Sequence, residues 1–296
     1  MFKPRCGTHL FGLQTPYGYA KFGFKAITSN KQKYSDRRLY NQPFQPQSHV
    51  FKTQQADFEL IQSFSVQKAG NAIAECEDIW DYRNRNPMVS IALSDGATES
   101  SFAREWAQEI VTNFVSRDLP WQEVYAGASH WLMPLQITWQ QWLAQQNLSW
   151  FAKRKAGEGA FATFVSLEVF ADLGWKSLAV GDSCLFVVRD HCLQKSFPLQ
   201  HSQDFNYCPR LIGTNIKATN ILVSQIHGSA QIGDRFYLAT DAIACWIFKQ
   251  LETNQDPWAK LDEISSQDMF ANWVNELRDR HEIVNDDTTL LCLEIR

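Results

Sequence analysis

Aspartates recur at the ends of apolar stretches in this sequence, and they are the residues best suited to chemistry. Asp95 ends VSIALSD, Asp241 ends FYLATD, and Asp286 stands two residues before TTLLCLEI. Asp182 interrupts LAVGDSCLF, and Asp78 follows a glutamate in ECEDIW. A carboxylate beside an apolar strand is costly to desolvate unless a positive group compensates it. These motifs contain no Lys or Arg, so a metal ion shared by several carboxylates is the simplest compensating charge.

The donor chemistry narrows the choice of metal. The candidate ligands are all oxygens, with no His or Cys partner at metal-ligand spacing. Oxygen donors suit hard octahedral ions, so the sequence predicts Mg²⁺ or Mn²⁺ rather than zinc or copper. Gly96 follows Asp95, and because a glycine has no Cβ, its carbonyl can approach an ion closely. A lone aspartate at a strand end is usually a turn or capping residue, so the prediction rests on the ordered set.

The segments around these aspartates predict the elements that position them. Alternating or apolar runs rich in β-branched and aromatic residues predict strands at 57–69, 88–95, 160–170, 176–190, 234–243 and 288–295. Helical spacing predicts helices at 101–115, at 121–146 with an interruption or kink at Pro134, and at 265–282. Strands and helices come in runs rather than in strict alternation. This order is typical of an α+β protein whose antiparallel sheets are covered by helices.

Length and composition set broad limits. The chain has 296 residues, which allow one large domain or two small ones, and 45% of them are hydrophobic. No apolar run approaches the roughly 18 residues that span a bilayer, and the N-terminal stretch is too broken for a signal peptide. We therefore expect a cytoplasmic protein with no membrane partner. The sequence has seven cysteines, an odd number, and no two of them form a CxxC motif. We therefore expect free thiols rather than a set of disulfides or a zinc site.

Residues 1–56 differ from the rest of the chain. They hold nine Lys and Arg against one acid, Asp36, whereas the whole chain has a net charge of −4. Their polar composition and lack of a sustained period predict a basic, irregular N-terminal extension ahead of a domain at 57–296. A basic arm can bind nucleic acid or an acidic partner. More often such an arm is a solvated tail or lies on its own domain, and no recognition motif accompanies the charge, so nucleic acid is the minor alternative.

The ordered set of motifs resembles the type-2C family of metal-dependent serine/threonine protein phosphatases, in particular a prokaryotic branch of it. The matching motifs are ED at 77–78, SDGATES at 94–100, GAFATFVSL at 159–167, VGDS at 180–183, ATDA at 239–242 and NDDTTLLCLEI at 285–295. The resemblance runs from about residue 57 to the end of the chain. It implies a four-layer sandwich of two antiparallel sheets with helices on both outer faces, and a variable flap at 191–233.

The resemblance also implies a dinuclear Mg²⁺ or Mn²⁺ site. Asp95 would bridge the two ions, and the carbonyl of Gly96 would bind one of them. Asp78 would hold one ion, partly through water, while Asp241 and Asp286 would hold the other. The family hydrolyses phosphoserine and phosphothreonine directly with water activated by the metals, so phosphorylated proteins and an antagonist kinase are the implied partners.

Some positions depart from the family pattern. Asp182 matches the candidate ligand of a weaker third ion, but Cys245 stands where an acid often supports that ion. Many members carry a phosphate-binding arginine five residues before the first metal-binding aspartate, where this chain has Ile73. Lys68 and Asn71 are the nearest candidates for substrate binding, and a lysine lacks the bidentate fork of arginine. Two alternatives therefore stay open: a catalytically weak phosphatase-like binding or regulatory module, and a two-metal hydrolase of small phosphate esters.

Overall fold

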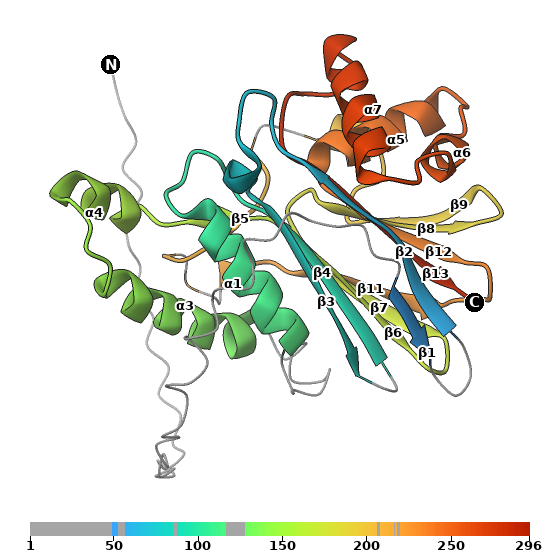
Figure 1. Ribbon diagram of the computed structural model, residues 1–296. Helices are drawn as coiled ribbons and strands as arrows, with labels where there is room; N and C mark the ends of the chain where they lie inside the picture. The colour runs from blue at the N-terminus through green and yellow to red at the C-terminus, as the bar shows by residue number, and fades with distance from the viewer. Residues whose placement is uncertain are drawn as a thin grey trace, which may run out of the picture. The chain divides into compact units, whose positions relative to one another are not determined.

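The structure, a computed structural model, describes residues 49–52, 57–85, 88–116, 128–205, 208–215, 217 and 220–296. These residues all belong to one unit that spans residues 43–296. Figure 1 shows two β-sheets packed face to face, with helices on the outer side of each. No helix in the described ranges has both the length and the apolar character that a membrane span requires.

The larger sheet is antiparallel and has the strand order β1-β2-β13-β12-β8-β9. Its strands in that order are His49–Lys52, Asp57–Val66, Thr288–Ile295, Arg235–Ala239, Cys184–Arg189 and Cys192–Phe197. The second sheet is also antiparallel, in the order β11-β7-β6-β4-β3. Its strands in that order are Ser224–Ser229, Gly174–Val180, Phe164–Phe170, Met88–Asp95 and Asp78–Arg85. A short pair joins β10 (Ile212–Gly213) to β5 (Phe161–Ala162).

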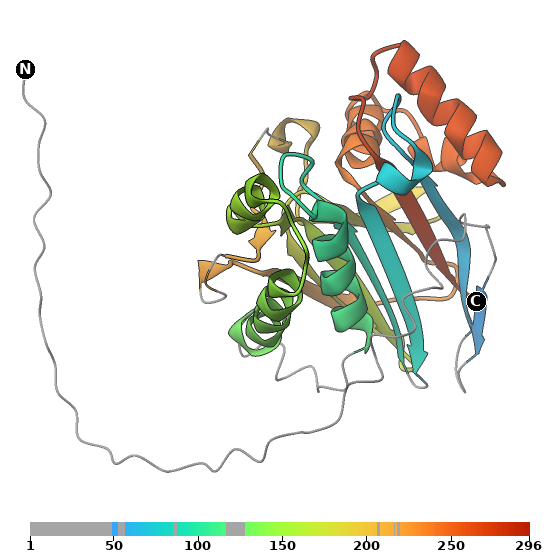
Figure 2. The same cartoon turned by 60° about the vertical axis from the view of Figure 1, so that its left-hand side comes forward.

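Six α-helices are described. They are α1 (Ala103–Ser116), α3 (Ala128–Ala144), α4 (Trp150–Gly157), α5 (Asp241–Glu252), α6 (Pro257–Asp262) and α7 (Gln267–Asp279). Two 3₁₀ turns, η2 (Ile73–Glu75) and η3 (Ser202–Asp204), lie in loops. Figure 2 shows α1 and α3 on the outer side of one sheet and α5 to α7 on the outer side of the other.

Three hydrophobic clusters hold four layers together. Alternate residues of β4 (Val89, Ile91 and Leu93) face Phe236 and Leu238 of β12 in the cluster between the two sheets. A second cluster joins the outer face of the β4 sheet to α1 and α3, and a third joins the outer face of the β12 sheet to α5, α6 and α7. Because the central strands bury both of their faces, β4, β6, β8, β12 and β13 are largely apolar, whereas the edge strands β9 and β11 are more polar. The predicted α+β sandwich is confirmed.

Several element boundaries differ from the sequence-based predictions. The apolar run at 176–190 forms two strands in different sheets, β7 and β8, because the chain turns at Gly181, whose φ is +100°. The run at 234–243 ends as a strand at Ala239, and α5 begins at Asp241. Helix α3 continues past Pro134, because that proline lies on the exposed side and removes only one donor.

The predicted irregular extension contributes a strand. Residues 49–52 form β1, which pairs with β2 and adds an edge to the larger sheet. Residues 1–48 and 53–56 of that extension lie outside the described residues, as does 121–127 of the predicted second helix, whose described part is α3. Strand β3 was not predicted, because DIWDYRNR mixes charged and aromatic residues without clean alternation.

Candidate metal and active site

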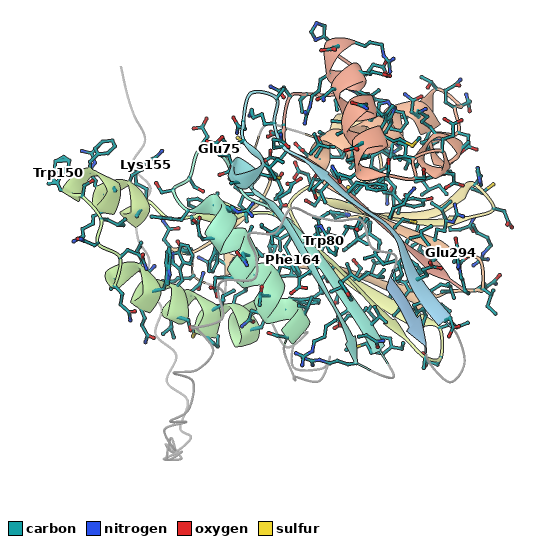
Figure 3. All side chains as sticks on the ribbon, viewed as in Figure 1. Glu75, Trp80, Trp150, Lys155, Phe164 and Glu294 are labelled. Atoms are coloured by element: carbon teal, nitrogen blue, oxygen red, sulfur yellow. The ribbon has the colours of Figure 1, made fainter. Side chains whose placement is uncertain are left out.

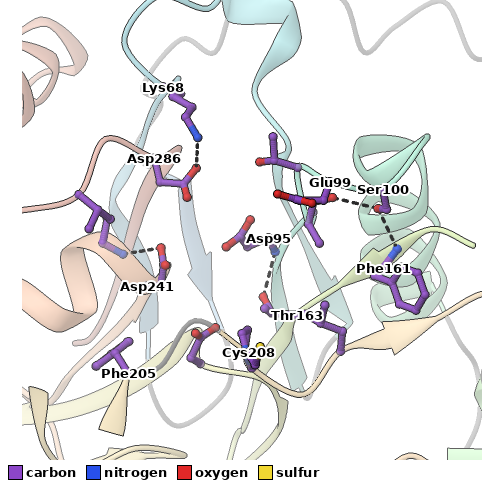
Figure 4. A pocket seen from close by; sticks show the side chains of 18 of the residues that line it. Lys68, Asp95, Glu99, Ser100, Phe161, Thr163, Phe205, Cys208, Asp241 and Asp286 are labelled. Carbon is purple, nitrogen blue, oxygen red and sulfur yellow. Dashed lines mark hydrogen bonds and ion pairs between the residues drawn. The ribbon is translucent and has the colours of Figure 1, made fainter. Parts of the chain in front are cut away.

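The predicted aspartates come from four separate places in the fold and reach one end of the sandwich. Asp78 begins β3 and Asp95 ends β4, and the two residues are directly opposite each other in the antiparallel pair. Opposite residues project to the same face of a sheet, so this register brings their carboxylates together. Asp241 begins α5, and Asp286 lies just before β13. Figure 4 shows the carboxylates of Asp95, Asp241 and Asp286 pointing toward one another.

These side chains line a cleft of about 980 Å³. Its wall includes Asp95, Gly96, Asp182, Asp241 and Asp286. The cleft is therefore rich in acids, as the sequence-based prediction required. Asp78 does not line this cleft, because it is buried below the surface with 1% of its area exposed. Of the four carboxylates predicted to bind the two ions, three therefore face the cleft and one is buried beneath it.

The carboxylates raise one another's pKa. Burial raises the pKa of Asp95 well above its usual range, and the negative charges of Asp78 and Asp241 raise it further. Burial, together with repulsion from Asp182 and Asp286, raises the pKa of Asp241 to about 7. Burial also raises the pKa of Asp182 to about 6. Clustered carboxylates of this kind are costly to keep ionised unless cations are added.

Asp78 is the most strongly constrained of the group. Burial is the largest cause of its raised pKa, and the charge of Asp287 is the next. Its Oδ2 accepts a hydrogen bond of 3.0 Å from the hydroxyl of Thr240, which itself accepts one of 2.8 Å from the backbone N–H of Thr289. Its Oδ1 is buried and makes no hydrogen bond with any described residue. A buried carboxylate oxygen without a donor is suited to a positive ligand.

The backbone of Asp95 is fixed by Thr163. The N–H of Asp95 donates to the Thr163 hydroxyl at 3.1 Å, and the N–H of Thr163 donates to the Asp95 carbonyl at 2.8 Å. The Thr163 hydroxyl also shares a hydrogen bond of 2.7 Å with the hydroxyl of Ser183, which is fully buried. Ser183 therefore has a positioning role and is not accessible as a nucleophile. Gly181 is required beside it, because a Cβ there would lie 2.8 Å from the Cβ of Thr163.

Gly96 is constrained by packing as well as by chemistry. A Cβ on Gly96 would lie 2.9 Å from the backbone carbonyl carbon of Ala103, at the start of α1. The close approach of that helix therefore requires a glycine after Asp95. The sequence pattern suggested a carbonyl aimed at an ion, and the structure supplies a second, independent reason for the same residue.

Lys68 places a positive charge beside the carboxylate cluster. Its Nζ lies 3.6 Å from Oδ1 of Asp286, and the residue lines the cleft. Its loop is held by Asp287, whose two carboxylate oxygens accept hydrogen bonds of 2.6 Å from the backbone N–H groups of Lys68 and Glu77. Asn71 is exposed and does not line the cleft. Ile73, at the position of the family's arginine, has 64% of its surface exposed.

The arrangement provides oxygen donors but not a preformed ligand cage. Within the described ranges, no three Asp, Glu, His or Cys side chains stand at the mutual spacing of ligands around one ion. The carboxylates of Asp95, Asp241 and Asp286 nevertheless face one space, and a cation between them would relieve their repulsion. Carboxylate oxygens are the donors that face this space, and oxygen donors suit hard divalent ions.

Sequence reasoning missed the residues that hold the aspartates in place. Thr163, Thr240 and Asp287 each bond to an acid of the cluster or to the backbone beside one. Each lies within a motif that was recognised, namely GAFATF, ATDA and NDDTT. The signal available in the sequence was a small hydroxyl residue or a second acid next to each aspartate. Its bonding partner, far away in the chain, could not be identified.

Comparison with known proteins gives similarity at the level of structure. No known protein family and no curated protein matches the sequence. Among solved structures, the serine/threonine phosphatase Stp1 from Staphylococcus aureus matches with a TM-score of 0.57 and 14% identity, over 84% of this chain and 98% of that one. A bacterial serine phosphatase matches with a TM-score of 0.54 and 14% identity, over 79% of this chain and 97% of that one.

A third structure comes from a different biological setting. The photosystem II phosphatase PBCP matches with a TM-score of 0.52 and 15% identity, over 79% of this chain and 98% of that one. In all three matches nearly the whole of the solved chain is covered. The chain described here therefore has the fold of the serine/threonine phosphatases, as its resemblance to the type-2C family predicted.

Proposed function

We propose that this protein is a metal-dependent serine/threonine protein phosphatase that hydrolyses phosphoserine and phosphothreonine at a dinuclear Mg²⁺ or Mn²⁺ centre. The observation that carries the proposal is the convergence of Asp95, Asp241 and Asp286 at one acidic cleft, with the buried Asp78 directly opposite Asp95 in the strand pair. The shared fold with known serine/threonine phosphatases supports it. Phosphorylated proteins are the proposed substrates, and a kinase that phosphorylates them is the proposed antagonist.

The residues present fit such a centre. The orphaned Oδ1 of Asp78 and the repulsion between Asp95 and Asp241 both call for added positive charge. In the proposed assignment Asp78, Asp95, Asp241 and Asp286 would hold the two ions. The carbonyl of Gly96, which lines the same cleft, would be a further oxygen donor. Asp182, which lines the same cleft, is the proposed ligand of a third, weaker ion.

In direct hydrolysis by water, the side chains of the protein bind the ions and orient the groups that bind them. When bound, two divalent ions lower the pKa of water and neutralise the phosphoryl oxygens of the substrate. The aspartates keep their side chains ionised and oriented for the ions, while Thr163 and Thr240 hold Asp95 and Asp78 in place. Ser183 is buried and is not available as a nucleophile, and direct attack by water requires no phosphorylated enzyme intermediate.

Lys68 is proposed to bind the substrate phosphate. It lines the cleft, where its Nζ lies 3.6 Å from Asp286 and its charge also acts on Asp241. Its backbone is anchored by Asp287, so the ammonium group projects from a fixed loop. A lysine binds phosphate as a point charge rather than with a bidentate fork, so we expect weaker phosphate binding than an arginine would give. Asn71, the second candidate, would contribute only if its exposed loop moved toward the cleft.

The decisive experiment is hydrolysis of p-nitrophenyl phosphate with Mn²⁺, in the wild-type protein and in Asp95→Asn. We expect metal-dependent hydrolysis in the first and none in the second, with the same circular dichroism spectrum. Hydrolysis by Asp95→Asn at the wild-type rate would refute the site assignment. No hydrolysis by the wild-type protein, together with retained Mn²⁺ binding, would instead favour a phosphatase-like binding module, as the loss of an arginine at Ile73 suggests.

The substrate class requires a second comparison. A panel of phosphoserine and phosphothreonine peptides is compared with small phosphate esters at equal concentration. A protein phosphatase should show higher kcat/KM for the peptides, because contacts outside the phosphoryl group add binding energy that favours the transition state. Preference for the small esters would instead assign the protein to the two-metal hydrolases of small molecules.

A further inference from the structure

Helix α4 presents an unusual surface at the rim of the cleft. The helix has the sequence WFAKRKAG, and Trp150 and Phe151 have 69% and 64% of their surfaces exposed. Their rings are stacked with centroids 6.3 Å apart and planes 10° from parallel. The three following cations, Lys153, Arg154 and Lys155, are exposed as well. Large aromatic side chains exposed next to a basic cluster are typical of a surface that binds a partner.

The helix is anchored, so this surface is presented in a fixed orientation. Ser149 caps its N-terminus by accepting a hydrogen bond from the N–H of Ala152 at 3.3 Å. Ala156 is buried on the opposite side, with 5% of its surface exposed. After the helix, the side chain of Asn215 donates to the carbonyl of Glu158 at 2.6 Å. The aromatic and basic side chains therefore project away from a small, buried alanine face.

The cations of α4 are not used inside the described structure. Lys153, Arg154 and Lys155 form no ion pair or side-chain hydrogen bond with any described residue. Two of them lie in the last turn, where they interact favourably with the helix dipole. That stabilising effect explains basic residues at this end, but it does not explain two exposed aromatic rings one turn earlier. Trp150 precedes Arg154 by four residues and Phe151 precedes Lys155 by four, so each ring shares a helix face with a cation.

The surface of α4 is continuous with the cleft. Lys155 and Glu158 line the cleft together with Asp95 and Asp241. Figure 3 shows Trp150 at the outer end of α4 and Lys155 nearer to the rest of the protein. A chain segment that leaves the cleft past Lys155 would therefore reach the other cations and then the rings.

We propose that α4 is a docking surface for a phosphoprotein substrate, which binds an acidic segment with an apolar residue next to the phosphorylated side chain. The proposal rests on the proposed phosphatase function and names its substrate class. Charge complementarity selects this occupant: the cleft itself is acidic and repels an acidic peptide, whereas three unpaired cations at its rim attract one. The exposed rings supply apolar contact beyond the charged contacts.

The test uses two phosphothreonine peptides that differ only in flanking sequence, one with Asp, Glu and Leu and the other with Ser and Gly. Turnover with Mn²⁺ and binding by fluorescence anisotropy are measured for the wild-type chain and for Lys153→Glu/Arg154→Glu. We expect the double variant to raise KM for the acidic peptide about tenfold at low salt, because two attractive contacts become repulsive. The neutral peptide and p-nitrophenyl phosphate should change less than about twofold, since both variant residues lie outside the cleft wall. The preference of the wild-type chain for the acidic peptide over the neutral peptide should decrease at high ionic strength.

Two further variants separate the proposal from general effects. Lys195→Glu/Lys260→Glu changes net charge by the same amount at exposed positions on β9 and α6, away from the cleft wall, and should leave the acidic peptide's KM unchanged. Trp150→Ala/Phe151→Ala should weaken binding of the acidic peptide without changing hydrolysis of p-nitrophenyl phosphate. Equal loss in the control variant would show that α4 has no specific role and would overturn the proposal.

The remaining outcomes are also decisive. If the wild-type chain binds the two peptides equally, α4 is not a docking surface, whether or not the protein hydrolyses p-nitrophenyl phosphate. If hydrolysis fails but the acidic peptide binds through α4, the docking proposal stands and the proposed activity fails. Sedimentation with phosphatidylserine vesicles tests the competing occupant. Vesicle binding that is lost in Trp150→Ala/Phe151→Ala, without any peptide preference, would assign the surface to a membrane and refute the proposal.

Discussion

Thr240 connects the metal-site candidate Asp78 to the backbone of the neighbouring strand, and its replacement tests the architecture of the site. Its side chain is fully buried. Its hydroxyl donates to Oδ2 of Asp78 at 3.0 Å and accepts from the N–H of Thr289 at 2.8 Å. Thr240→Val keeps the size of the side chain but removes both hydrogen bonds. Thr240→Ser keeps the hydroxyl and removes one methyl group.

The two variants should differ in stability by an amount that the contacts allow us to estimate. Thr240→Val leaves a buried N–H and a buried carboxylate oxygen unpaired, which costs about 1–3 kcal/mol for each group, or about 2–6 kcal/mol in total. Thr240→Ser loses only a buried methyl group, which costs about 1 kcal/mol. Against a typical unfolding free energy of about 5–15 kcal/mol, the loss in Thr240→Val is a large fraction.

The assay is urea unfolding of the metal-free protein, followed by circular dichroism, with EDTA present. We expect the free energy of unfolding to fall by at least about 1 kcal/mol more in Thr240→Val than in Thr240→Ser. A Mn²⁺ titration of hydrolysis gives a second readout: Thr240→Val should need more Mn²⁺ for half-maximal activity, because the Asp78 carboxylate is no longer oriented. Equal stability of the two variants would refute the reasoning, since it would show that the hydroxyl bridge contributes nothing.

Three other perturbations follow from the site. Burial and neighbouring carboxylates raise the pKa of Asp241 to about 7, so the metal-free folded chain holds a proton that the unfolded chain releases near pH 3.9. Its unfolding free energy should therefore fall as pH rises from about 4 to about 7, and Asp241→Asn should flatten that slope in urea titrations at several pH values. Gly96→Ala places a Cβ 2.9 Å from the backbone of α1. The substitution should lower the free energy of unfolding by about 1–3 kcal/mol and lower Tm by about 2–12 °C in a thermal melt. An unchanged Tm would contradict the packing argument. In Asp287, two carboxylate oxygens accept hydrogen bonds from the backbone N–H groups of Lys68 and Glu77, and Asp287→Asn replaces one of these acceptors with a donor. The free energy of unfolding in urea should fall by about 1–3 kcal/mol. An unchanged value would show that these hydrogen bonds do not stabilise the fold.

The sequence predicted those parts of the fold whose signals are local. Strands β4 and β13 have the predicted bounds, 88–95 and 288–295, because each is a continuous apolar run between polar turns. Helix α7, predicted at 265–282, occupies Gln267–Asp279, with its cap at Ser266. Strong periodicity and a recognisable cap determine such elements independently of tertiary structure.

Other parts depend on contacts between distant residues and could not be predicted. The run at 176–190 looks like one strand, because its apolar character continues across Gly181–Ser183. The structure divides it between two sheets, and the division depends on Gly181 packing against Thr163. The order of the aspartates could be recognised from the sequence, but the pairing of Asp78 with Asp95 depends on the register of β3, a strand with no clear pattern.

Substitution of the clustered carboxylates and substitution of the residues that position them should change the free energy of unfolding in opposite directions. In the metal-free chain, Asp95 and Asp241 repel each other and are buried at a cost, so replacing one of them by Asn should raise stability while removing the response to Mn²⁺. Thr163 and Thr240 make only favourable contacts, so their loss should lower stability while the response to Mn²⁺ persists in weakened form. A site selected for stability alone would show losses at all four positions. We therefore propose to measure the unfolding free energy of all four variants with and without Mn²⁺. A gain in stability identifies a residue that is retained for binding cations, and a loss identifies a residue that is retained for the fold.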